Sequence, residues 1–210
     1  MTLFVATDAD LDSCFPSWRK PLAEQAPVEA INPFTKESMT FLSWDPGRPV
    51  DASAIPSFDD ARGRSPRPPI SPPENDTDKW LQKHEAPKLL RTLPYFTLYS
   101  IAGPPLRELL DLLKLPDSPP ERIVDCPEEE AEMFSFPDAV IGPLGALDDG
   151  ELKTILTAWQ KALKLRGKAL NSIETEAVEG SDWALRRIRA LATEAARQGG
   201  HFFGFVRYDV

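Results

Sequence analysis

Short apolar runs separated by proline and glycine make up most of this chain, and this pattern predicts short strands and short helices. Residues 3–6 form the first apolar run, which suits a strand. Thr7 or Asp8 can then cap a single helical stretch that Pro16 ends. The chain is therefore expected to open with a strand followed by a helix.

A β-hairpin and a long irregular segment are predicted next. Apolar residues at 28–31 and 39–44 flank the turn-forming sequence NPFTKE, which favours a hairpin. Residues 46–78 show no periodic pattern of hydrophobic residues and contain eight prolines. This segment therefore cannot bury enough apolar surface to offset its chain entropy. We predict an extended or mobile Pro-rich loop there.

The middle of the chain is predicted to contain further short elements. A helix over residues 80–93 is interrupted at Pro87, and the β-branched and aromatic run at 95–101 suits a strand. The prolines at 104–105 open a short helix with leucines at helical spacing. The remaining candidates for short strands are residues 122–125 and 132–136.

The C-terminal third has the clearest periodicity. Asp148 and Glu151 form a capping box for one helix. A second helix is predicted to begin near Ser181 or Asp182 and to end at Gly199. The sequence HFFGFVRY then places apolar side chains on both faces, as a central strand does. The apolar stripe of the first helix comprises Leu152, Ile155, Leu156, Trp159, Ala162 and Leu163.

Together these elements predict an α+β fold with a mixed or antiparallel sheet, amphipathic helices packed on it, and the C-terminal strand in a central position. We expect a single domain over residues 1–210, with residues 46–78 as the Pro-rich loop. The strand and hairpin unit at 1–45 is too small to fold alone without a disulfide, so we expect it to pack on residues 79–210.

The composition is that of an ordinary globular protein, with 41% hydrophobic and 27% charged residues. No apolar stretch approaches the roughly 20 residues that a bilayer-spanning helix needs. Acidic residues near the N-terminus interrupt the apolar core that an export signal would need. We therefore expect a cytoplasmic protein that binds no membrane, with Cys14 and Cys126 as reduced thiols.

Negative charge is concentrated in one stretch of the chain. Between Ile123 and Leu152 there are nine acidic residues and no lysine or arginine, whereas the rest of the chain sums to zero. A field of one sign repels nucleic acid and can steer a basic protein partner. A solvated acidic loop is the alternative interpretation. The candidate partner-binding residues are Asp125, Glu128, Glu129, Glu130, Glu132, Asp148 and Asp149.

The acidic residues after the first apolar run raise the question of an active site. A strand followed by D-x-D at Asp8 and Asp10 resembles the nucleophile motif of haloacid-dehalogenase-type phosphatases, in which the first Asp attacks phosphorus and the second acts as acid and base. The resemblance covers about eight residues, and Leu11 and Asp12 depart from the small residue and the Thr or Val typical of that family. Carboxylates in a first helical turn also face the positive end of the helix dipole, so we favour capping over catalysis.

No other motif predicts chemistry. A thiol–imidazole pair of Cys14 with His84 or His201 is left open, although lone cysteines are more often small buried residues. We predict no catalytic residue, no metal site and no cofactor. The basic residues expected on the solvent faces of the two C-terminal helices, where they can pair with the acidic stretch, are Lys153, Lys161, Lys164, Arg166, Lys168, Arg186, Arg187 and Arg189.

These observations favour a non-enzymatic, cytoplasmic bacterial protein that binds a basic protein partner. Bacterial immunity proteins, which neutralise toxins, are often small, acidic and without catalytic motifs, and this analogy rests on size and charge. One alternative is a metal-assisted hydrolase that uses Asp8 and Asp10. Another is a scaffold or assembly module that uses the Pro-rich loop, where Pro66, Pro69 and Pro72 follow the repeat of a polyproline II helix.

Overall fold

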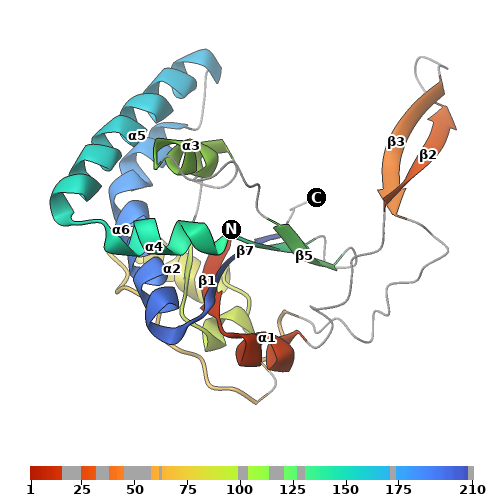
Figure 1. The fold of residues 1–210 in the computed structure, drawn as a ribbon, viewed down its shortest axis with the longest axis horizontal. Coiled ribbons are helices and arrows are strands. Elements are labelled where there is room, and N and C mark those ends of the chain that lie inside the picture. The colour runs from red at the N-terminus through yellow and green to blue at the C-terminus, as the bar shows by residue number, and fades with distance from the viewer. Residues whose placement is uncertain are drawn as a thin grey trace.

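The structure is a computed structural model that describes residues 1–15, 25–31, 38–44, 58–61, 63–98, 104–113, 121–126, 131–170 and 174–207. Strands and helices alternate irregularly along the chain (Figure 1). In order they are β1 (Thr2–Ala6), α1 (Asp8–Cys14), β2 (Gln25–Ile31), β3 (Ser38–Trp44), α2 (Asp76–His84), the 3-10 helix η2 (Leu90–Thr92), β4 (Tyr95–Thr97), α3 (Pro104–Leu112), β5 (Glu121–Cys126), β6 (Ala131–Ser135), α4 (Asp138–Ala146), α5 (Asp149–Leu170), α6 (Glu174–Gln198) and β7 (His201–Arg207).

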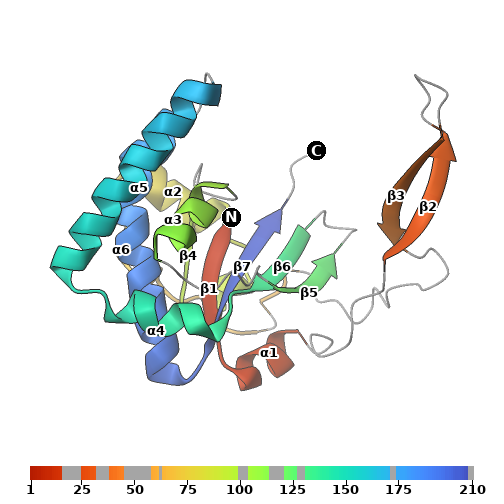
Figure 2. The same ribbon diagram turned by 45° about the horizontal axis from the view of Figure 1, so that its top comes forward.

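Five strands form one antiparallel sheet in the order β4-β1-β7-β6-β5 (Figure 2). The C-terminal strand β7 is the middle strand and pairs with β1 on one side and β6 on the other. This confirms the predicted α+β class and the central C-terminal strand. The predicted hairpin, β2 and β3, forms a separate two-stranded sheet. Its predicted turn at 32–37 lies outside the described residues, and its packing on residues 79–210 stays a prediction.

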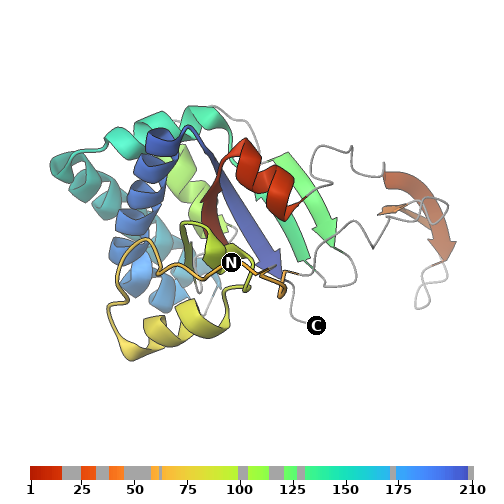
Figure 3. The same cartoon turned by 90° about the horizontal axis from the view of Figure 1, so that it is seen from below.

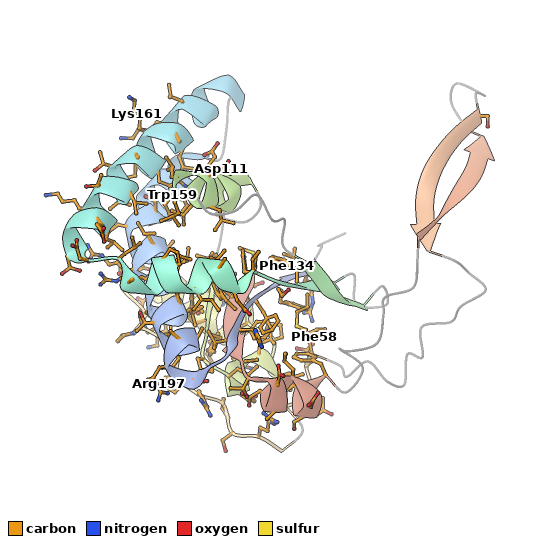
Figure 4. The ribbon with its side chains drawn as sticks, viewed as in Figure 1. Phe58, Asp111, Phe134, Trp159, Lys161 and Arg197 are labelled. Carbon is orange, nitrogen blue, oxygen red and sulfur yellow. The ribbon has the colours of Figure 1, made fainter. Side chains whose placement is uncertain are left out.

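Side chains of successive strand residues point to opposite faces of the sheet, so the two faces have separate cores. Leu3 and Val5 of β1 face a cluster that includes buried residues of α3, α4, α5 and α6. Phe4 of β1 faces a second cluster, built with α1, η2 and Phe58. Phe134 and Phe58, both labelled in Figure 4, belong to the first and the second cluster respectively. The sheet is thus covered on both sides.

An aromatic side chain crosses the middle of the sheet where β7 has a glycine. Gly204 lies opposite Phe134 of β6 in the strand register. A Cβ added at Gly204 would lie 2.3 Å from the Phe134 ring, so any side chain there would displace this ring. Glycine at this position therefore lets Phe134 cover the strand and complete the helix-side core.

Helix boundaries differ from the predictions in α6. This helix begins at Glu174, so the prediction of a start near Ser181 or Asp182 was wrong. Ser181 has a fully buried side chain whose Oγ is 3.0 Å from the Gln160 Nε2 of α5. This interhelical bond holds the serine inside the helix, whereas the sequence pattern reads serine as a cap. The predicted helix end at Gly199 is confirmed by its left-handed φ of 62°.

The helix α4 was not predicted from the sequence, because Pro143 and two glycines lie within it. Pro143 removes one backbone donor from the helix interior. Gly145 allows the close packing of α4 on α6: a Cβ there would meet the Thr193 nitrogen at 3.3 Å. Tertiary packing thus supports a helix whose local propensity is poor.

A buried ion pair joins α2 to α6. Arg187 donates from Nη1 to Asp78 Oδ1 at 2.9 Å and from Nη2 to Asp78 Oδ2 at 2.7 Å. Its Nη2 also donates to the Pro72 carbonyl at 2.9 Å, and its side chain is only 2% exposed. The prediction that Arg187 lies on a solvent face was therefore wrong. The bidentate pair fixes both helices and the Pro-rich segment in one arrangement.

The charge on Asp78 is held by several donors. Burial raises the pKa of Asp78, but hydrogen bonds from Arg187, the Glu74 backbone N–H and Gln82 together outweigh burial and hold this pKa below its ordinary value. Gln82 continues the network to the sheet, since its Oε1 accepts from the Thr97 N–H at 2.8 Å and its Nε2 donates to the Thr97 carbonyl at 2.9 Å. A side-chain amide thus occupies the place of a neighbouring strand along the outer edge of β4.

Candidate functional site

The fold separates the predicted partner-binding residues into two groups. Asp125 lies in β5 and Glu132 in β6, while Asp148 and Asp149 lie where α5 begins. Figures 1 and 2 place β5 and the start of α5 on opposite sides of the molecule. Residues 128–130 lie outside the described part of the chain.

The carboxylates that open α5 are exposed and have local partners. The Glu151 N–H donates to Asp148 Oδ1 at 2.8 Å and the Asp148 N–H to Glu151 Oε2 at 3.0 Å, which confirms the predicted capping box. Arg189 of α6 donates to Asp149 Oδ1 at 2.8 Å, and this hydrogen bond lowers the pKa of Asp149. Asp149 nevertheless stays 89% exposed. This group therefore presents negative charge to solvent.

Three elements that are distant in sequence, α1, α4 and β7, meet at a cluster of two aspartates and one histidine. His201, the first residue of β7, lies between the start of α4 and the start of α1. Its Nδ1 is 2.9 Å from Asp138 Oδ1, and its Nε2 is 3.2 Å from Asp8 Oδ1. All three side chains are at least partly exposed. The cluster is open to water rather than enclosed.

The geometry of this cluster determines the charge of the imidazole. A carboxylate can only accept hydrogen bonds, so both ring nitrogens of His201 must carry protons to bond Asp138 and Asp8 together. The hydrogen bond to Asp138 raises the pKa of His201 above its ordinary value; burial partly lowers it, and Asp8 raises it further. The cluster therefore favours the protonated form of the His201 ring, held between two carboxylates.

Protonation of His201 is expected to stabilise the fold. Because its folded-state pKa is raised, the stabilisation is complete below the unfolded pKa of about 6.5 and is lost as pH rises through the folded pKa. An NMR titration of the His201 ring measures this pKa directly. Asp138→Asn should lower it more than Asp8→Asn, since the Asp138 hydrogen bond is the larger cause. A wild-type pKa at or below 6.5 would contradict this account.

Asp10 has a different environment from Asp8, although both belong to the D-x-D sequence. Thr7 caps α1, as predicted: the Asp10 N–H donates to Thr7 Oγ1, and the Asp10 carboxylate accepts from the Thr7 N–H at 3.1 Å. The Asp10 carboxylate also lies 3.8 Å from Arg64. Within the described part of the chain, no group of three or more His, Cys, Asp and Glu side chains is arranged to hold a metal ion.

Cys14 and His84, two residues of the thiol–imidazole pairs that the sequence leaves open, each pack against other side chains. Cys14 is fully buried in the second cluster, under α1, as expected for a small buried residue. The His84 ring stacks on exposed Trp80 of α2, with ring centroids 5.3 Å apart. His201 is engaged by Asp8 and Asp138 instead.

The meeting of Asp8, Asp138 and His201 was not predicted. The sequence gives no signal for it, because Asp138 belongs to the unpredicted helix α4.

The helices in the described residues include none long and apolar enough to cross a membrane. Comparison with known proteins identifies no matching family, no similar curated protein and no similar solved structure.

Proposed function

We propose that this protein acts by binding a basic protein partner through its exposed carboxylates rather than by catalysis. The start of α5 supports the proposal most directly. Within the described residues Asp148 and Glu151 hold no ion pair, and Asp149 has Arg189 as its ion-pair partner. Asp148 and Glu151 thus carry charges that no ion pair neutralises, which favours a positively charged partner.

The seven proposed partner-binding residues of the acidic stretch fall into the two groups described above, and the partner contacts one group while the other adds to the long-range attraction. A toxin neutralised by an immunity protein is one partner with this chemistry, and a cytoplasmic bacterial protein would suit that role. Long-range attraction would speed the encounter, while a few well-packed side chains would set the rate of dissociation. Association should therefore depend on salt more strongly than dissociation does.

Charge reversal tests this proposal. A partner is first isolated by affinity capture at low ionic strength, and the association rate of the purified pair is then measured over a range of salt concentrations. The triple variant Glu128→Lys, Glu129→Lys and Glu130→Lys should slow association by about tenfold or more and flatten its salt dependence. Asp149→Lys tests the second group, at the start of α5.

The matched control is Asp111→Lys, which reverses one exposed carboxylate of α3, outside the acidic stretch. Its association rate should equal that of the wild type within about twofold. If the triple variant and Asp149→Lys both associate as fast as this control, the acidic stretch is not the interface.

The competing proposal is a hydrolase in which Asp8 and Asp10 bind a divalent cation. Calorimetry with Mg²⁺, Mn²⁺ and Ca²⁺ on the wild type and on Asp8→Asn separates the two. Heat of binding that Asp8→Asn abolishes would favour the hydrolase. An absence of heat with all three ions would leave the binding proposal in place.

A further inference from the structure

The Pro-rich segment is fixed to the body of the protein by backbone hydrogen bonds. The Arg67 N–H donates to the Arg91 carbonyl at 2.6 Å, and the Ile70 N–H donates to the Tyr95 carbonyl of β4 at 2.9 Å. Farther along, the Pro72 carbonyl accepts from Arg187. Figure 3 shows the segment as the orange trace that leads into α2. The two N–H donors lie three residues apart.

The backbone of residues 65–69 is restricted to few conformations. Pro66, Pro68 and Pro69 have φ fixed near −65° by their rings. Ser65 and Arg67 each precede a proline, which disfavours the helical region for them. Both restrictions favour the polyproline II conformation, which has three residues per turn and rises about 3.1 Å per residue. These five residues would then form a rod of roughly 15 Å, ending at the bend of residues 70–71.

One edge of such a rod faces the protein, and the other two face outward. With three residues per turn, Arg67 and Ile70 lie one turn apart, and their N–H groups bond to the body of the protein. Pro66 and Pro69 lie along the second edge, and Ser65 and Pro68 along the third. Ser65, Pro66 and Pro68 are exposed, and Pro69 is half-buried. Pro66 and Pro68 therefore remain accessible, and Pro69 is accessible in part.

We propose that residues 65–69 are a preformed polyproline II ligand for a small domain with an aromatic-lined groove, of the SH3 or WW kind. Such grooves recognise exposed prolines in this conformation and gain from a ligand that is already ordered. Residues 65–69 lie outside the acidic stretch, and exposed prolines are recognised by aromatic rings rather than by cations, so the partner differs in class from the basic protein proposed above.

The test uses the full-length chain against an array of purified SH3 and WW domains. At least one domain should bind the wild type, and the double variant Pro66→Ala and Pro69→Ala should bind it about tenfold more weakly or worse. The matched control is Pro73→Ala, an exposed proline beyond the bend, which should change the affinity by less than about twofold. Unchanged thermal unfolding of each variant shows that the fold is intact.

A second measurement uses only the wild-type protein. In NMR titrations with the bound domain, the amide signals of Ser65 and Arg67 should shift, and those of Asp148 and Asp149 at the start of α5 should not. Failure of every domain to bind at millimolar concentration would overturn the proposal. Binding that survives the double proline variant, or that shifts the α5 amides instead, would overturn it equally.

Discussion

Replacing Arg187 with methionine is expected to lower the free energy of unfolding by about 3–5 kcal/mol. Methionine keeps much of the side-chain volume but leaves the Asp78 carboxylate buried without its cation, and an uncompensated buried charge is strongly destabilising. The Pro72 carbonyl also loses its donor. Urea unfolding of both proteins at neutral pH measures the difference.

The control for this variant is Arg189→Met, two residues farther along α6. Arg189 also pairs with an aspartate, but Asp149 is exposed, and surface pairs of this kind contribute little to stability. Equal losses from Arg187→Met and Arg189→Met would contradict a special role for the buried pair.

The same pair makes the fold sensitive to acid. The pKa of Asp78 is lowered in the folded state, so its stabilisation is complete above the unfolded pKa of about 3.9 and is lost as pH falls through the folded value. Since Asp78 ionisation is favourable largely because of Arg187, the variant should lose less stability than the wild type over this acid range.

Replacing Trp159 with alanine is expected to cost about 3–5 kcal/mol, because the side chain is fully buried in the helix-side core, where α5 packs on α3 and α6. The loss combines the transfer of a large apolar side chain with the cavity left behind. Figure 4 labels Trp159 on α5. Denaturant unfolding measures the loss. If the slope of the unfolding free energy against denaturant concentration is the same in both proteins, the variant differs in stability and not in its unfolded state.

Leu165→Ala is the matched control on the same helix. Leu165 is 60% exposed, so its truncation should change stability by no more than about 0.5 kcal/mol. A loss for Trp159→Ala as small as that for Leu165→Ala would mean that α5 does not pack on the core through its predicted stripe.

Sequence patterns predicted an element correctly where its apolar residues recur with the period of a helix or a strand and so form the buried face. The stripe that includes Leu152, Trp159 and Leu163 faces the core as predicted, since all three side chains are buried. The C-terminal strand is central because both of its faces are apolar, and only a strand covered on both sides buries such residues.

Sequence reasoning failed where tertiary partners decide the outcome. Arg187 was assigned to solvent from its charge, although it lies three residues after buried Ala184 and four before buried Leu191, within the apolar stripe of α6. That spacing was a usable signal. No comparable signal exists for His201, whose two carboxylate partners come from α1 and from the unpredicted helix α4.

The Gln82 amide has a consequence for self-assembly. The outward backbone groups of Thr97 in β4 are bonded by Gln82, and the Tyr95 carbonyl is bonded by Ile70, so this side of the sheet cannot accept a strand from another molecule. In the strand order β5 is the other edge. Two copies that joined through β5 would leave only their β4 edges in this five-stranded sheet, so its growth by strand addition would stop at a pair and could not continue into a fibril.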